Sequence, residues 1–243
     1  MKALFLSILL FCFSPSTEGD GKDERAILTK QESIAAASYL KHTEKAMVWE
    51  INLVRSDPQA YIPFVLEEMT RMRRDSIELS TIRSESITTR VEQIAGIAQV
   101  RVDTVYRNYY QDRMQALAEL IIELDRAIPV QGLEPSLPLY TAAVKHGDSQ
   151  SETGYISHRG RDGAWPFDRH VREHGGLQEG NENILRFKGS PREMVIQLLI
   201  DSGVPHRGHR RNILDPRWKY VTCHHVQQLD QGEVQWWIQE FAY

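Results

Sequence analysis

An apolar repeat between residues 106 and 128 is the feature that most restricts how this chain can fold. Its members are Tyr106, Tyr110, Met114, Leu117, Ile121, Leu124 and Ile128. Steps of three or four residues put them on one face of a helix, which we expect from about Asp103 to Ala127. Such a stripe must be covered by other parts of the chain, so we interpret it as core packing and not as a ligand site.

Four other segments carry helical signals. They are residues 43–55, a stretch restarting at Asp57-Pro58, residues 139–151, and residues from Ser190 to about 201. Ser190 and Glu193 have the spacing of a capping box, with proline at the first helical position. Residues 70–103 are rich in Arg, Ser and Glu, with apolar residues at helical spacing, so we expect 70–128 to be a helical insertion. The Gly-rich stretch 154–181 is expected to form loops.

The C-terminal end has the alternation of strands. Apolar and polar residues alternate between Trp218 and Val226, turn at Asp230-Gln231-Gly232, and alternate again from Val234 to Phe241. This pattern predicts a β-hairpin, and 183–187 is a further strand candidate. Helices around a small antiparallel sheet predict an α+β fold, arranged as an α/β/α sandwich.

The first residues have the layout of a secretory signal peptide. Met1-Lys2 is followed by an apolar run from Ala3 to Phe13 and then by small residues up to Gly19. The run is shorter than the roughly 20 residues that span a bilayer. We therefore predict a signal peptide at 1–19, a polar lead-in at 20–41, a folded domain at 42–243, and a secreted protein, extracellular or periplasmic.

Cysteine and charge narrow the class of protein further. Cys12 would leave with the signal peptide, so Cys223, expected to be buried in a strand, is the one remaining thiol and the domain depends on its apolar core. Lys and Arg number 29 and Asp and Glu 33, a net charge of −4. This balance gives no electrostatic basis for a nucleic-acid partner, and no later segment is long and apolar enough to be transmembrane.

Histidines direct attention to the last third of the chain, because eight of the nine lie between residues 146 and 225. Three fragments stand out there. They are Ile156-Ser157-His158-Arg159-Gly160, Asn181-Glu182-Asn183-Ile184, and Gly203-Val204-Pro205-His206-Arg207-Gly208-His209-Arg210-Arg211-Asn212-Ile213. With the early segment Glu50–Tyr61, they resemble the CAP superfamily of cysteine-rich secretory, antigen 5 and pathogenesis-related class 1 proteins, in its disulfide-poor bacterial-type branch.

The resemblance covers roughly 43–243 and implies an α/β/α sandwich with a cleft holding two histidines and two acids. Matched motif to motif, His158 and His209 take the histidine places and Glu182 takes the first acid. The second acid is expected near the end of the 190–201 helix, where Asp201 is the candidate. The sequence departs from the family pattern at Asn181, where a glycine is usual.

Two imidazoles brought together in this way suit a divalent cation, and zinc is the ion that we expect at His158 and His209. The preferred function is a secreted binding module whose cleft holds this cation and binds a lipid or other small ligand. The alternative is a metal-dependent hydrolase or peptidase with Glu182 as the catalytic proton acceptor. That chemistry needs a third protein ligand and a bound water.

Other polar residues in this region allow more than one interpretation. Arg207, Arg210 and Arg211 could bind an anion, or could be loop anchors or a solvated face. Asp162 and Arg169 are expected to form an ion pair that shapes their loop. For the histidine at position 146, we expect the role of tying its helix to a loop.

Overall fold

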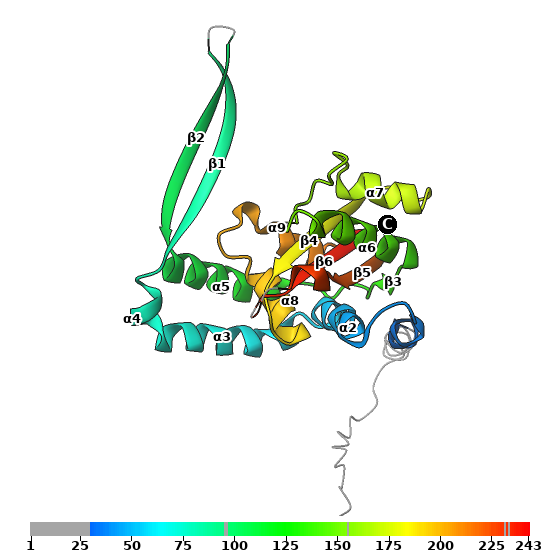
Figure 1. Ribbon diagram of the computed structural model, residues 1–243. Coiled ribbons are helices and arrows are strands. Elements are labelled where there is room, and N and C mark those ends of the chain that lie inside the picture. The colour runs from blue at the N-terminus through cyan, green and yellow to red at the C-terminus, as the bar shows by residue number, and fades with distance from the viewer. Residues whose placement is uncertain (1–29, 95–96, 155, 231, 233) are drawn as a thin grey trace, which may run out of the picture.

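The computed structural model describes residues 30–94, 97–154, 156–230, 232 and 234–243 (Figure 1). The helices are α2 (His42–Ser56), α3 (Ile62–Arg74), α4 (Ser76–Leu79), α5 (Tyr109–Arg126), α6 (Leu137–Ser151), α7 (Pro166–Glu173), α8 (Pro191–Ile200) and α9 (Gly208–Leu214). The strands are β1 (Arg83–Ile94), β2 (Ile97–Asn108), β3 (Glu134–Pro135), β4 (Gly180–Arg186), β5 (Tyr220–His225) and β6 (Trp236–Ala242). Short 3₁₀ turns lie at Gln59–Tyr61, Pro205–Arg207 and Gln227–Leu229.

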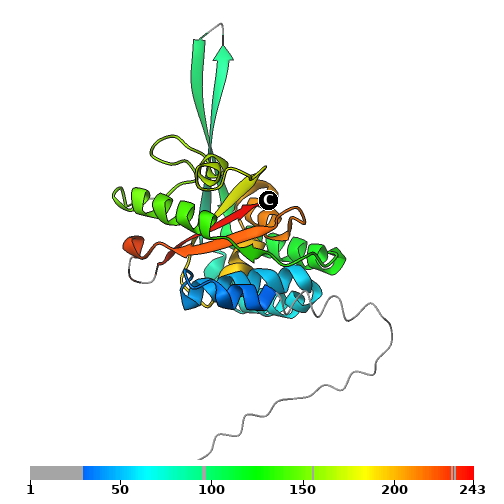
Figure 2. The ribbon, with the colours of Figure 1, turned by 90° about the vertical axis from the view of Figure 1, so that its right-hand side faces the viewer.

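The strands of the domain form one four-stranded sheet in the order β3-β5-β6-β4. β6 pairs antiparallel with both β4 and β5, and β3 runs parallel to β5. Helices α6 and α7 cover one face of this sheet, and α2 and α8 lie on the other (Figures 1 and 2). The fold is therefore the α/β/α sandwich of the α+β class that the sequence predicts.

Each face of the sheet has its own apolar packing. The larger cluster joins the sheet to α2, α3, α5 and α8, with Leu117, Leu120 and Trp237 among its buried members. The smaller one, on the α6 face, is Ala143, Ile156, Val226, Leu229 and Ile238. Successive residues of a strand point to opposite faces, so β6 can send Trp237 and Phe241 into the larger cluster and Ile238 and Glu240 towards α6 and α7.

Several local signals lead to the predicted elements. The capping box of α8 is formed, with the Ser190 hydroxyl accepting from the Glu193 amide. The C-terminal hairpin appears as β5 and β6, and the strand candidate at 183–187 as β4. Helix α7 is a departure from the sequence prediction, which expects loops over 154–181.

The expected helical insertion at 70–128 is wrong for its central part. Residues 83–94 and 97–108 form an antiparallel β-ribbon that projects from the domain (Figure 1), and α5 begins only at Tyr109. This stretch is rich in Ile, Val and Thr, whose branched side chains favour strands over helices. The register pairs Val91 with Val100, so apolar residues whose spacing fits a helix also fit a hairpin.

The N-terminal predictions fall partly outside the described residues. The signal peptide at 1–19 lies wholly outside them, as does the lead-in up to residue 29. The remainder of the lead-in is helical over 30–36, and Ile34 and Leu40 are buried in the larger cluster, so the folded unit begins before residue 42. Among the described residues, no helix is long and apolar enough to cross a membrane.

Candidate functional site

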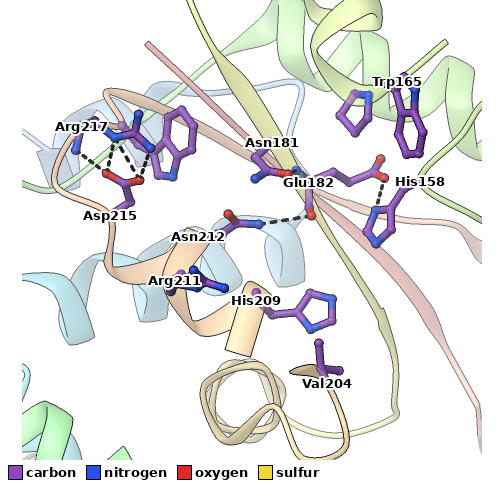
Figure 3. Close-up of a pocket in the computed structure, with 13 residues that line it drawn as sticks. His158, Trp165, Asn181, Glu182, Val204, His209, Arg211, Asn212, Asp215 and Arg217 are labelled. Atoms are coloured by element: carbon purple, nitrogen blue, oxygen red, sulfur yellow. Dashed lines mark hydrogen bonds and ion pairs between the residues drawn. The ribbon is translucent and has the colours of Figure 1, made fainter. Parts of the chain in front are cut away.

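A cleft of about 550 Å³ opens between the loop that precedes α7, strand β4 and helix α9 (Figure 3). Its lining residues are His158, Trp165, Pro166, Asn181, Glu182, Val204, Gly208, His209, Arg211, Asn212, Asp215, Arg217 and Trp218. Three of the four predicted site residues are thus in its wall. The fourth, Asp201, is buried behind His209.

The first histidine of the cleft is held by a carboxylate from the sheet. His158 Nδ1 lies 2.8 Å from Glu182 Oε1, and the His158 side chain is 46% exposed whereas that of Glu182 is fully buried. The loop backbone around His158 is fixed by Arg169, whose Nη1 donates to the His158 carbonyl at 2.9 Å. His146 holds the preceding carbonyl, that of Ser157, at 2.8 Å, which matches the predicted role of tying α6 to a loop.

The second histidine is held in the same way by the helix end before it. Asp201 closes α8 in the left-handed region, with φ of 52°, where Asp and Asn are more common than most residues. Its Oδ1 lies 2.7 Å from His209 Nδ1 and its Oδ2 accepts from the His209 amide at 2.9 Å. The second acid is therefore present, but it orients His209 without lining the cleft.

Helix α9 is fastened to β4 beside Glu182. The Asn212 amide donates to Asn183 Oδ1 at 2.7 Å and to the Glu182 carbonyl at 3.3 Å. This brings the His158 and His209 rings to a centroid separation of 6.4 Å. No hydrogen-bond partner for either Nε2 atom is found in the described part of the chain.

The part of the chain that builds this cleft matches a family model. Residues 93–241 match the model of the cysteine-rich secretory protein family, abbreviated CAP, and this match covers more than half of the chain. The chain belongs to the CAP family. The match begins in the projecting ribbon, so α2 and the early motif Glu50–Tyr61 lie outside it.

Two solved structures are similar to this CAP protein. An outer surface protein from Borrelia burgdorferi is 16% identical, with a TM-score of 0.40 over 54% of this chain and 92% of that chain. An extracellular protein containing a SCP domain from Bacillus anthracis is 18% identical, with a TM-score of 0.36 over 60% of this chain and 46% of that chain. No curated protein sequence matches the chain significantly.

A buried charge network lies behind the cleft of this CAP domain. Glu182 on β4 and Glu240 on β6 are direct cross-strand partners, and both are buried. Arg169 of α7 bridges them, with Nη2 at 2.6 Å from Glu182 Oε2 and 3.5 Å from Glu240 Oε1. His170 Nε2 lies 2.8 Å from the other oxygen of Glu240. One guanidinium thus serves two carboxyl groups.

This environment shifts the protonation of the network. Burial, and next the charge of Glu240, raise the pKa of Glu182 to about 7. Burial also raises the pKa of Glu240 to about 7, against the opposing effect of Arg169. Burial and the nearby Arg169 charge lower the pKa of His170 to about 4. His170, which lies in a polar segment of the sequence, is therefore a neutral, fully buried side chain.

We expect the substitution Glu240→Gln to change how stability depends on pH. A carboxyl whose pKa is raised on folding stabilises the native state below its unfolded pKa, and this stability is lost as pH rises through about 7. Glutamine removes that loss but keeps an acceptor for His170. Relative to wild type, the variant should gain about 1–3 kcal/mol between pH 5 and pH 8.

The measurement is urea unfolding at pH 5, 6, 7 and 8 with a chelator present, with the exposed Glu152→Gln as the control. A difference between Glu240→Gln and wild type that stays constant across this range would contradict the shift.

Two other sequence expectations have different outcomes. The predicted Asp162–Arg169 ion pair is wrong, because Asp162 pairs with Arg172 at 2.5 Å and Arg169 turns inward to the carboxyl pair. Arg169 and Arg172 are three residues apart and so are neighbours on the surface of α7, but packing on the sheet buries Arg169 and leaves Arg172 exposed. Cys223 is a buried thiol in β5, as expected.

Glu240 and His170 are the members of the site that sequence reasoning missed. The signal available in the sequence was that Glu240 is the charged residue of the predicted strand from Val234 to Phe241, where a buried carboxylate would need a partner. That partner, Arg169, lies 71 residues away in the sequence. The pairing therefore depends on how α7 packs on the sheet, which no local pattern in the sequence predicts.

Proposed function

We propose that this protein is an exported CAP-domain binding module whose cleft coordinates a divalent cation, zinc, through His158 and His209 and binds a lipid or other small ligand beside it. One observation carries the proposal. Two imidazoles share a cleft, each with Nδ1 on a buried carboxylate and with Nε2 unbonded among the described residues. Carboxylates orient metal-binding histidines in this way, since the Nδ1 proton leaves the Nε2 lone pair for the ion.

The residues present fit a metal site with open coordination positions better than a structural site in which the protein supplies every ligand. Ring centroids 6.4 Å apart are close to the spacing of about 5–6 Å that two imidazoles on one zinc ion would have. In the described part of the chain, no group of three or more His, Cys, Asp or Glu side chains is arranged to hold a metal. Two protein ligands leave the remaining positions to water or to a bound ligand.

Export is supported by the sequence layout of residues 1–19. In addition, one similar structure is titled an outer surface protein and the other an extracellular protein. The lead-in at 20–41 would then follow the cleaved segment, and its residues Ile34 and Leu40 are buried in the larger cluster.

The geometry favours binding over hydrolysis. A hydrolase would need Glu182 as a base, and its pKa of about 7 would suit that role. However, Oε1 is held by His158 and Oε2 by Arg169 at 2.6 Å, and the Glu182 side chain is fully buried, so neither oxygen is presented to a water in the cleft. Glu182 is placed to orient His158.

The test is zinc binding by the purified chain, measured by calorimetry and by metal analysis after dialysis. We expect one zinc ion per chain, and a loss of at least 100-fold in affinity when both histidines are replaced in His158→Ala/His209→Ala. His174→Ala, a histidine outside the cleft, is the matched control and should bind as wild type does. Equal zinc affinity in the double variant and the wild type would overturn the metal proposal.

The same preparations decide between binding and hydrolysis. The zinc-loaded protein should hydrolyse no substrate in a panel of peptides, esters and glycans. Turnover that disappears in Glu182→Gln while zinc stays bound would favour the hydrolase instead.

A further inference from the structure

The fragment 203–213 contains three arginines, of which two hold parts of the fold together and one faces the cleft. Arg207 pairs with Glu119 at 2.8 Å and donates to the Asp201 carbonyl at 2.9 Å. Arg210 is buried and bonds the carbonyl groups of Leu199, Ala116 and Ile200. Arg211 lines the cleft with the two histidines and is exposed. It makes no hydrogen bond or ion pair with the other residues that the structure describes.

The acidic side chains of the cleft have partners other than Arg211. Asp215 is held by Arg217 at 2.7 Å, and Arg217 also reaches Glu179 at 2.6 Å. Glu182 is held by Arg169 and His158, as described above. The guanidinium of Arg211 is therefore an uncompensated positive charge in the wall of a concave site, where the surrounding protein strengthens its attraction for an anion.

An exposed aromatic ring belongs to the same cleft. Trp165 is 55% exposed, although side chains of this size are usually well covered. In Figure 3, Trp165 and Arg211 lie on opposite sides of the two histidine rings, and all four side chains line one cavity of about 550 Å³. A ligand that reaches both ends would pass the histidines.

We propose that the cleft recognises a small organic anion, with its carboxylate or phosphate on the Arg211 guanidinium and a flat apolar part on the Trp165 ring. A guanidinium binds either anion through two parallel hydrogen bonds, and an indole face offers a large apolar surface. This rests on the proposed function, since it uses the same cleft, and it narrows the ligand to an anion.

The test is calorimetric titration of the purified chain with benzoate and with phenyl phosphate, and with benzamide as the neutral counterpart. The two anions should bind at least tenfold more tightly than benzamide. The ratio of the two anion affinities shows whether the site prefers a carboxylate or a phosphate. Arg211→Gln should weaken anion binding at least tenfold, and Arg211→Lys less, because it keeps the charge but not the planar pair of donors. Trp165→Ala should weaken all three probes.

Arg73→Gln is the matched control, since it removes the same charge from an exposed position on α3. It should leave anion binding unchanged. Equal binding of the anions by Arg211→Gln and the wild type would overturn the proposal, as would an equal loss in Arg73→Gln.

Titrations on metal-free and zinc-loaded protein keep this proposal separate from the previous one. The Arg211→Gln effect should appear in both forms, with zinc affinity within twofold of wild type. A wild-type chain that binds no zinc would count against the metal site alone, because the metal-free titration still tests Arg211. A wild-type chain that binds neither anion overturns the anion site, whatever its zinc affinity.

Discussion

Replacing Arg169 by methionine should lower the free energy of unfolding at pH 8 by about 3–5 kcal/mol, since it leaves buried carboxylates without their cation. Arg169 contacts Glu182 at 2.6 Å and Glu240 at 3.5 Å, and it is itself 7% exposed. Methionine fills a similar volume, so the loss reports charge and hydrogen bonding more than packing. In a chain of this size the expected fall in Tm is roughly 6–20 °C, measurable by circular dichroism.

A matched control lies one turn further along the same helix. Arg172 pairs with Asp162 at the surface, with 56% of its side chain exposed, so Arg172→Met should cost less than about 1 kcal/mol. Adding Glu182→Gln and Glu240→Gln to Arg169→Met should restore part of the stability, because no buried charge remains unpaired. Equal losses for Arg169→Met and Arg172→Met would show that the bridge does not hold the network together.

The substitution Arg169→Met should also affect the cleft. Arg169 donates to the His158 carbonyl at 2.9 Å, so its loss releases the backbone that positions His158. We expect weaker zinc binding in the folded variant.

The second large effect is expected at Arg210. Its guanidinium is 2% exposed and bonds the carbonyl groups of Leu199 at 2.5 Å, Ala116 at 3.0 Å and Ile200 at 3.2 Å. These contacts join α9 to α5 and to the end of α8. Arg210→Met takes the donor from the carbonyl groups of Leu199 and Ile200 at the end of α8 and the cation from Glu123, which Arg210 contacts at 2.8 Å. We therefore expect a loss of about 3–5 kcal/mol in the free energy of unfolding.

The adjacent arginine is the control for this experiment. Arg211 is exposed and makes no hydrogen bond or ion pair with the other described residues, so Arg211→Gln should change stability by less than about 0.5 kcal/mol. Urea unfolding of the two variants measures the difference. Similar losses at both positions would mean that the two arginines do not differ as the structure assigns, and would also weaken the case for Arg211 as a ligand-binding residue.

Local signals in the sequence located much of this domain. The capping box at Ser190 and Glu193, the apolar stripe of α5 and the alternation of β5 and β6 each depend on residues within a few positions of one another. For this reason they could be recognised without any tertiary information. The motifs likewise pointed to His158, Glu182 and His209, which the structure places in one cleft.

The same local reasoning was wrong where two structures fit one pattern. Val91, Ile94, Ile97 and Val100 suit a helical face, yet they also fall within the paired strands of the ribbon. The β-branched composition of 83–108 was the better signal. The start of α5 was also misplaced, since Asn108 caps this helix and Tyr106 belongs to β2.

Short-range patterns in the sequence are enough to predict the class of fold, and the resemblance to the CAP superfamily points to the two cleft histidines. Which charges meet depends on how the elements pack. Glu182 faces Glu240 through strand register, Arg169 reaches both from α7, and Asp201 meets His209 through a left-handed helix end. Glu182, Glu240 and Arg169 are distant in sequence, and Asp201 reaches His209 because the chain reverses at the end of α8. Because these groups are buried, their pairing is the main influence on their protonation.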